Sequence, residues 1–436
     1  MHKKFALTPP MGWNSWDCYG AAVNEEQLLA NADYMAKNLK DYGWEYVVCD
    51  IQWSEPTADG YAYHNFVPLY MDEYSRLIPS PERFPSSAGG KGFKPIADYV
   101  HSLGLKFGIH IMRGIPRQAV HQNTNTITEG ITARDIAQQY SICPWNADMY
   151  GVNPDAKGAQ EYYDSLFKLY ASWDVDYIKC DDIANTEFLK DNPYSARREI
   201  EMLRKAIDNC GRDMVLSLSP GPAPVWEHEH LAANANLWRM TGDFWDEWSK
   251  LYAMFERCYA WQEYVQPGAW PDCDMLPLGR LQLTEKDPKY KNRYTRFTHD
   301  EQITMMTLWG IFRSPLMMGG EMRENDEFTL SLLQNRELID MLKNSSGARQ
   351  FKREETDDGK GEIIWTSKGE NCKYVALFNT DDEVREIVFD VTDVTIGGIE
   401  YSVWDMWKHE EHAVTSGKFS AEVNPHGARL FKIKVK

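Results

Sequence analysis

Short apolar runs alternate with amphipathic helical stretches from the start of the chain to about residue 342. In residues 25–40, for example, the apolar positions Leu28, Leu29, Ala32 and Met35 recur at helical spacing. The pattern predicts strands over residues 11–16, 44–50, 105–111, 176–181, 214–218, 237–240, 269–275 and 316–319. It predicts helices over residues 25–40, 93–103, 160–173, 196–209, 248–264, 300–312 and 327–342.

This alternation makes roughly eight strand–helix units, which favours a parallel sheet closed into a (β/α)8 TIM barrel. A doubly wound open sheet is the alternative, but no glycine-rich phosphate loop follows the first predicted strand. After about residue 347 the sequence pattern changes to short β-rich runs joined by turns, and no helical periodicity remains. We therefore expect a barrel over residues 1–345 and a C-terminal antiparallel β-sandwich over residues 346–436.

Charge and composition narrow the class of ligand. The formal net charge of −18 disfavours nucleic acid, anionic membranes and polyanionic substrates, and a neutral oligosaccharide or glycoside fits better. The chain has 16 Trp and 23 Tyr, and aromatic faces both bind sugars and fill cores. No apolar run is long enough for a membrane span. Whether the chain forms a homo-oligomer is left open.

The first ten residues and the cysteines bear on the compartment of the protein and on the redox state of its thiols. Residues 1–10 lack the apolar core of a signal peptide, although a processed form could have lost one. The eight cysteines are scattered and form no CxxC pair, so we expect reduced structural thiols in a cytoplasmic enzyme.

Carboxylates recur at the ends of four predicted strands, where a barrel places its active site. They are Asp50, Asp181 with Asp182, Asp243 with Asp246, and Asp272 with Asp274. Any one of these residues could be a helix N-cap. Carboxylates at four strand ends repel one another, however, and this cost indicates a function. That function is either a divalent metal site or carboxylate chemistry on a polyhydroxylated ligand.

A metal site finds little support in the sequence. The histidine-bearing segments 227–230 and 409–412 have the wrong spacing or position for a metal-binding helix. We interpret both as solvated polar segments, and we expect neither a metal nor a cofactor.

Glycoside hydrolysis needs two carboxyl groups on either side of one anomeric carbon. Asp181 fits the nucleophile, because Lys179 on the same face of its strand would keep it ionised and bind sugar hydroxyls. Asp243 fits the acid/base, with Arg239 four residues before it to hold a hydroxyl. A retaining mechanism then predicts a separation of about 5 to 5.5 Å between the two carboxyl groups.

At these residues the chain resembles glycoside hydrolase family 27, the α-galactosidase and α-N-acetylgalactosaminidase family. The similar segments, in the family's order, are residues 9–16, 46–53, 177–181, 238–243, 270–275 and 313–316. The resemblance implies a barrel with a C-terminal β-sandwich, and it supports Asp181 and Asp243 in their two roles. It further implies that Trp16 packs on the sugar, that Asp50 binds its O4/O6 side, and that Asp274 binds substrate.

Two departures from the family bear on the sugar. Ile51 stands where α-galactosidases carry a second acid, which suits a sugar without a hydroxymethyl group, such as β-L-arabinopyranose. The alternative is that Ile51 only packs against its loop. Ser219 stands where many α-galactosidases bind the 2-hydroxyl, and this resembles the N-acetylgalactosaminidases.

The resulting hypothesis is a retaining exo-glycosidase that releases α-D-galactopyranosyl or β-L-arabinopyranosyl residues. The alternatives are an α-N-acetylgalactosaminidase, a non-catalytic galactoside-binding protein on the same scaffold, and a metal-dependent sugar isomerase. Turnover of nitrophenyl glycosides excludes the binding protein, and loss of activity with a chelator would favour the isomerase.

Overall fold

Eight parallel strands form a closed barrel in the amino-terminal part of the chain. The computed structural model describes residues 2–394, 400–414 and 417–435. The strand order is β12-β1-β2-β3-β6-β7-β8-β9, and a parallel bridge between Leu276 and Met318 joins the two ends of the sheet. The strands are β1 (Met11–Asn14), β2 (Tyr46–Cys49), β3 (Lys106–Met112), β6 (Tyr177–Asp181), β7 (Val215–Leu218), β8 (Leu237–Arg239), β9 (Trp270–Asp272) and β12 (Leu316–Met318). The predicted (β/α)8 barrel is confirmed.

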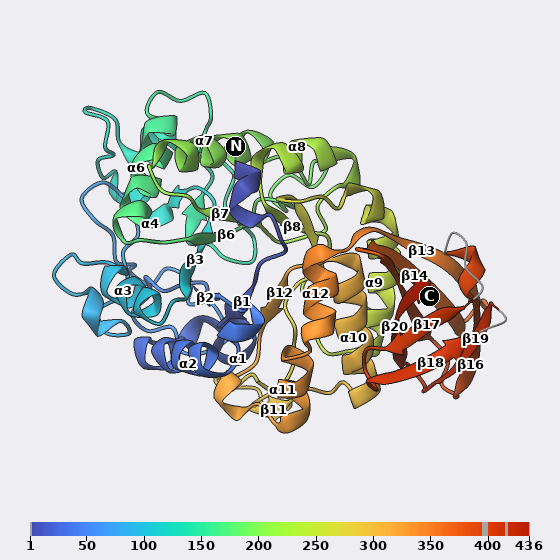
Figure 1. Cartoon of the computed structure of the whole chain (residues 1–436). Helices are drawn as coiled ribbons and strands as arrows, with labels where there is room; N and C mark the ends of the chain where they lie inside the picture. Colours follow the sequence, from blue (N-terminus) through green and yellow to red (C-terminus); the bar gives the residue numbers. More distant parts are fainter. Residues whose placement is uncertain (1, 395–399, 415–416, 436) are drawn as a thin grey trace.

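Helices follow the barrel strands and cover the outside of the barrel (Figure 1). They are α2 (Glu25–Asn38), α3 (Lys94–Ser102), α6 (Ala159–Ser172), α7 (Arg197–Asn209), α8 (His228–Asn234), α9 (Trp248–Trp261), α10 (His299–Phe312), α11 (Glu327–Leu333) and α12 (Arg336–Asn344). Their starts have a local cause: Asn24 and Thr298 form capping boxes that satisfy the first amide groups of α2 and α10.

Two predicted elements differ from the structure. The strand predicted over residues 11–16 ends at Asn14, and Trp16 begins a short helix, α1 (Trp16–Tyr19). The single helix predicted over residues 327–342 is two helices, because the side chain of Asn335 accepts hydrogen bonds from the amides of Glu337 and Leu338 and starts α12.

A long excursion separates β3 from α6, and the apolar pattern predicted none of its elements. It contains β4 (Ile115–Pro116), α4 (Arg117–Gln122), α5 (Ala133–Ile136) and β5 (Met149–Tyr150). A second small ribbon, β10 (Arg280–Leu281) with β11 (Arg293–Tyr294), lies between β9 and α10. Elements this short carry too few residues to show a period.

The carboxyl-terminal part is a β-sandwich, as predicted. One sheet has the order β13-β14-β15-β20-β17-β18, and β16 pairs with β19 across a shared apolar core. The strands are β13 (Ser346–Glu355), β14 (Gly361–Gly369), β15 (Cys372–Asn379), β16 (Arg385–Asp390), β17 (Tyr401–Asp405), β18 (Glu410–Val414), β19 (Lys418–Val423) and β20 (Ala428–Val435). β13, β18 and β19 are rich in polar residues and were not predicted. Because α12 ends at Asn344 and β13 begins at Ser346, we propose the domain boundary at residues 345/346.

The sandwich packs on α9 and α10 of the barrel (Figure 1). The ring of Trp248 stacks on His426 with centroids 3.7 Å apart, and Phe255 meets Phe378. Trp407 donates a hydrogen bond to Thr307. Within the described residues, the structure has no helix with the length and apolar character that crossing a lipid bilayer requires.

Candidate active site

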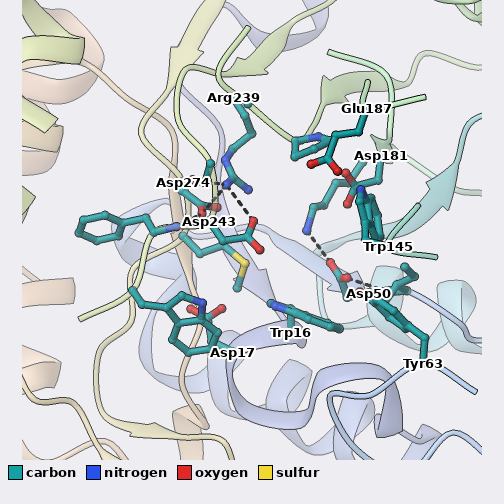
Figure 2. A pocket seen from close by; sticks show the side chains of 18 residues that line it. Trp16, Asp17, Asp50, Tyr63, Trp145, Asp181, Glu187, Arg239, Asp243 and Asp274 are labelled. Atoms are coloured by element: carbon teal, nitrogen blue, oxygen red, sulfur yellow. Dashed lines mark hydrogen bonds and ion pairs between the residues drawn. The ribbon is translucent and has the colours of Figure 1, made fainter. Parts of the chain in front are cut away.

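A cavity of about 340 Å³ opens at the carboxyl ends of the barrel strands (Figure 2). Eight of the nine predicted site residues line it: Trp16, Asp50, Ile51, Lys179, Asp181, Arg239, Asp243 and Asp274. The structure therefore brings together residues that are more than two hundred positions apart in the chain. A cavity of this size is within the usual range for a small-molecule site.

Asp181 is the last residue of β6 and is held by hydrogen bonds on both carboxylate oxygens. Nε2 of His110, from the neighbouring strand β3, lies 3.0 Å from Oδ2 of Asp181. The backbone amide of Asp182 donates to Oδ1 over 3.0 Å. The side chain is only 14% exposed, so its carboxylate is fixed in position within the cavity.

Lys179 lies two residues earlier on β6 and forms an ion pair with Asp50 at the end of β2. Its Nζ is 2.9 Å from Oδ2 of Asp50, and Nδ2 of Asn14 donates to the same oxygen over 2.8 Å. The other oxygen of Asp50 accepts from the amide of Ile51. Residues from three strands of the barrel, β1, β2 and β6, thus fix one charged pair at the cavity.

These contacts set the protonation states on this side of the cavity. Burial alone would raise the pKa of Asp181, but the hydrogen bond from His110 and the charges of His110 and Lys179 hold it well below its ordinary 3.8. Burial raises the pKa of Asp50, but the charges of Lys179 and His110 and the hydrogen bonds from Ile51 and Lys179 together outweigh it, so this pKa is also lowered. The pKa of Lys179 is raised by its two carboxylate neighbours despite burial. At neutral pH Asp181 is an anion, as a nucleophile must be.

Arg239, at the end of β8, forms ion pairs with Asp243 and Asp274 on the side of the cavity opposite Asp50 and Asp181 (Figure 2). Its Nη2 is 2.7 Å from Oδ2 of Asp274 and 3.2 Å from Oδ1 of Asp243. Asp243 follows β8 on a loop and its side chain is 67% exposed, whereas Asp274 is buried. The exposed carboxyl can exchange protons with solvent, which an acid/base needs.

Asp274 is a buried carboxyl with an unusual titration. Burial raises its pKa to about 7, with Asp243 and Asp272 adding to the rise, although Arg239 and the amide of Phe244 lower it. Its backbone has φ +84°, and its Oδ2 accepts from the amide of Phe244 over 2.9 Å. It supports Arg239 and the loop that carries Asp243.

Ile51 forms part of an apolar wall beside Asp50. It is 3% exposed and packs in a small cluster with Ala21, Met112, Cys143 and Met149. Trp16 and Tyr63 border the same cluster. Of the buried members of this cluster, Ile51 lines the cavity, and its side chain has no group that could bind a hydroxyl. Its position fits both interpretations, because it packs against its neighbours and also faces the cavity.

Ser219 is the predicted site residue that does not line the main cavity. It is 1% exposed, its Oγ has no hydrogen-bond partner among the described residues, and it faces a small adjoining cavity beneath Lys179 and Arg239. The next two residues, Pro220 and Gly221, line the main cavity instead. Binding of substrate by Ser219 stays a prediction.

Several cavity residues were not predicted from the sequence. His110, on β3, contacts Asp181. The cavity is also lined by Asp17, Tyr63, Trp145, Glu187 and Trp245. Tyr63 and Trp145 belong to the long loops after β2 and β3, which show no period. His110 lies within an apolar strand, and a polar residue there is the one signal that sequence reading could have used.

Among the described residues, one group of side chains could hold a metal ion: Asp98, His101 and Asp174. It lies at the amino end of β6, opposite the cavity, and Lys94 and Arg212 already pair with Asp174. His230, in the segment weighed as a metal site, instead contacts Tyr194 and Glu201. The polar groups of the cavity suit a hydroxylated ligand better than a cation.

Comparisons with known proteins identify the family of the chain. The family model described as alpha galactosidase A matches residues 8–153 and 148–344, and the model of the alpha galactosidase C-terminal beta sandwich domain matches residues 360–433. The chain is 27% identical over 429 residues to an α-galactosidase of Cyamopsis tetragonoloba, covering 97% of this chain and 85% of the relative.

Solved structures give higher similarity. The chain is 54% identical to a GH27 β-L-arabinopyranosidase from Geobacillus stearothermophilus, with a TM-score of 0.95 and coverage of 99% and 98% of the two chains. It is 50% identical to an α-N-acetylgalactosaminidase-like protein from Bacillus halodurans, with a TM-score of 0.87 and coverage of 98% and 97%.

Proposed function

This chain belongs to glycoside hydrolase family 27, and we propose that its preferred substrate is a terminal β-L-arabinopyranoside. It is a glycosidase of the α-galactosidase and β-L-arabinopyranosidase type, a class that hydrolyses with retention of configuration. The choice between the two sugars, and the residue roles below, are our proposals.

The observation that carries the choice of sugar is the apolar wall at Ile51. α-D-Galactopyranose and β-L-arabinopyranose differ only in the hydroxymethyl group at C5. Asp50, next to Ile51, accepts hydrogen bonds from Lys179 and Asn14. As a carboxylate it can also accept one from a ring hydroxyl of the sugar. Ile51 lines the cavity, and its side chain offers a 6-hydroxyl no hydrogen-bond partner, so burying that hydroxyl against it would cost binding energy. The named activity of the Geobacillus stearothermophilus neighbour supports the same choice.

We assign the two chemical roles from the surroundings of each carboxyl group. The ionised Asp181 attacks C1 while Asp243 gives its proton to the leaving glycosidic oxygen, which forms a glycosyl ester and releases the aglycone. Asp243, now a carboxylate, takes a proton from water, and the resulting hydroxide adds to C1 and releases Asp181. Two inversions retain the configuration. Lys179 and Arg239 hold ring hydroxyls, with Trp16 beneath the sugar.

We also propose that the enzyme works in a reducing compartment, the cytoplasm. All eight cysteines are unpaired, and six of them are buried. Buried thiols of this kind act as small apolar groups and are inert.

The test is the ratio of kcat/KM for matched nitrophenyl β-L-arabinopyranoside and α-D-galactopyranoside. We expect the arabinopyranoside to be favoured by at least about 10-fold, the scale on which one misplaced polar group discriminates. An equal or inverted ratio would contradict the proposal. A nitrophenyl α-N-acetylgalactosaminide in the same series tests the alternative that rests on Ser219, and no turnover of all three would favour a binding protein.

A further inference from the structure

Asp17 lies inside the cavity and plays no part in the mechanism described above. It follows Trp16 on α1, lines the cavity and is 3% exposed. Its Oδ2 is buried without a hydrogen-bond partner, and no ion pair to Asp17 is formed within residues 2–394, 400–414 and 417–435. A buried carboxyl without a partner is costly for the fold, and such costs are typical of functional positions.

The fold reserves space for this side chain. A Cβ on Gly319, directly after β12, would lie 2.1 Å from Oδ2 of Asp17 and 2.6 Å from its Cγ. The backbone carbonyl of Asp17 accepts hydrogen bonds from Tyr61 and from the amide of Gln282, which fixes the short helix. The carboxyl group is therefore positioned by its surroundings, although nothing in them binds it.

Burial and the surrounding acids favour the neutral form of the Asp17 carboxyl group. Burial raises its pKa well above the ordinary value, and Asp274, Asp243 and Asp246 add to the rise against a smaller opposing effect of Lys179. A neutral carboxyl group carries an O–H that can donate a hydrogen bond. An acceptor in the cavity, such as a sugar oxygen, would satisfy it.

We propose that Asp17 binds a hydroxyl group of the glycone on the acid/base side of the cavity. Figure 2 shows its carboxyl group beside Trp16, on the side of Asp243 and Asp274 and away from Asp50 and Tyr63. The site would then hold the sugar from both sides, with Asp50 on one and Asp17 on the other. The inference rests on the proposed glycosidase function.

Burial indicates the glycone rather than the aglycone as the partner. In an exo-acting pocket the glycone fills the closed end and the aglycone extends through the mouth. Asp243, which must reach the glycosidic oxygen, is 67% exposed, whereas Asp17 is 3% exposed and lies deeper. A hydroxyl group of the glycone is thus the acceptor within its reach.

The first experiment separates a binding role from a structural one. Asp17→Ala should lower kcat/KM by about 10-fold, the effect of one hydrogen bond to substrate, while the melting temperature stays the same or rises. Asp17→Asn keeps a neutral donor of the same size and should lose less. Unchanged kcat/KM in Asp17→Ala, or a loss explained by a lower melting temperature, would overturn the inference.

Gly319→Ala provides a second variant that leaves Asp17 in the sequence. The added methyl group must displace the carboxyl group, so this variant should lower kcat/KM about as much as Asp17→Ala. The double variant should lose no more than either single variant. Additive losses would mean that Gly319 acts independently of Asp17, and they would contradict the reserved space.

Monodeoxy substrates identify the hydroxyl group. With the 2-, 3- and 4-deoxy nitrophenyl glycosides, Asp17→Ala should leave kcat/KM unchanged for the analogue that lacks the bound hydroxyl and lower it for the others. An equal loss with all three would overturn the assignment. The series uses whichever parent sugar the wild type cleaves. Calorimetric binding of free L-arabinose and D-galactose to wild type and Asp17→Ala tests Asp17 even if neither glycoside is cleaved.

Discussion

The two carboxyl groups that we propose to flank the scissile bond lie in opposite surroundings. Asp181 ends a barrel strand, is 14% exposed and accepts from His110 and a backbone amide. Asp243 lies on a loop, is 67% exposed and has one side-chain partner, Arg239. A nucleophile must stay ionised and aligned, whereas an acid/base must exchange its proton with solvent. The difference in burial matches that division of work.

The same contrast extends to the cations behind each carboxyl group. Lys179 pairs with Asp50 at 2.9 Å, and Arg239 pairs with Asp274 at 2.7 Å. Burial opposes ionisation of both acids, yet the pKa of Asp50 is lowered and that of Asp274 is raised to about 7. Asp274 has carboxylate neighbours, while Asp50 is close to His110 and Lys179. The ionised form is thus favoured for Asp50 on one side of the cavity, whereas Asp274 on the other side reaches its neutral form far more readily.

Asp181→Asn should break the nucleophile side completely. The carboxamide is isosteric but cannot form the glycosyl ester, so kcat should fall by at least about 10⁴-fold. The measurement is single-turnover hydrolysis of a nitrophenyl glycoside, with near-UV circular dichroism to confirm the fold. Substantial residual activity that is not due to wild-type contamination would move the nucleophile to another residue.

The activity that remains in Asp243→Asn should depend strongly on the leaving group. Loss of the general acid should lower kcat/KM by about 10²- to 10⁴-fold for a disaccharide, whose leaving group needs a proton. Nitrophenolate leaves without one, so its kcat/KM should fall far less. Equal losses for the two substrates would exclude Asp243 as the acid. Glu187 is an exposed acid that also lines the cavity, so Glu187→Gln is the control.

Ile51→Asp should shift the sugar preference without changing either chemical role. A carboxylate beside Asp50 can accept from a 6-hydroxyl, so the galactoside to arabinopyranoside ratio of kcat/KM should rise by about 10- to 100-fold. Ile51→Leu keeps the wall apolar and should leave the ratio near its wild-type value. If both variants shift the ratio equally, shape rather than polarity determines the preference. The Asp variant should also melt at a lower temperature, because Ile51 is buried.

His110→Phe should give the smallest effect, a shift of the acid limb of the pH profile. The hydrogen bond from His110 helps to hold the pKa of Asp181 below 3.8, so its loss raises that pKa and moves the fall in kcat/KM to higher pH. His110→Gln keeps a donor and should shift less. An acid limb that does not move would remove His110 from the control of Asp181.

The same contact links pH to stability. Because the folded pKa of Asp181 is lowered, its ionised form stabilises the fold above about pH 3.8, and this contribution fades as the pH falls through the folded value. In His110→Phe that part of the acid dependence should be smaller, as measured by urea unfolding from about pH 6 down to about pH 2.

The barrel and the strand-end carboxylates could be predicted because they are encoded locally. Asp50, Asp181 and Asp274 each follow an apolar run, and parallel strands bring such positions to one end of a barrel. His110 could not be assigned, since it meets Asp181 from 71 positions away and lies within a strand rather than at its end. Asp17 directly follows the strand predicted over residues 11–16, so the rule that found the other acids also applies to it, but it was not singled out.

Ser219 shows a different limit. The end of its strand was predicted, and the residue does lie there, but its side chain faces the small adjoining cavity. A strand end determines which residues are near the site, whereas side-chain direction depends on the loop that follows. The split between α11 and α12 has a similar origin, because one asparagine cap overrides a continuous helical pattern.

The most direct test of the division between Asp181 and Asp243 is to trap the glycosyl-enzyme. A fluorinated glycosyl fluoride of the preferred sugar slows hydrolysis of the intermediate, and peptide mass spectrometry then locates the ester. The account predicts one sugar per chain, attached to the peptide that carries Asp181 and absent from Asp181→Asn. A label on Asp243 or on another acid, or turnover without any covalent intermediate, would contradict it.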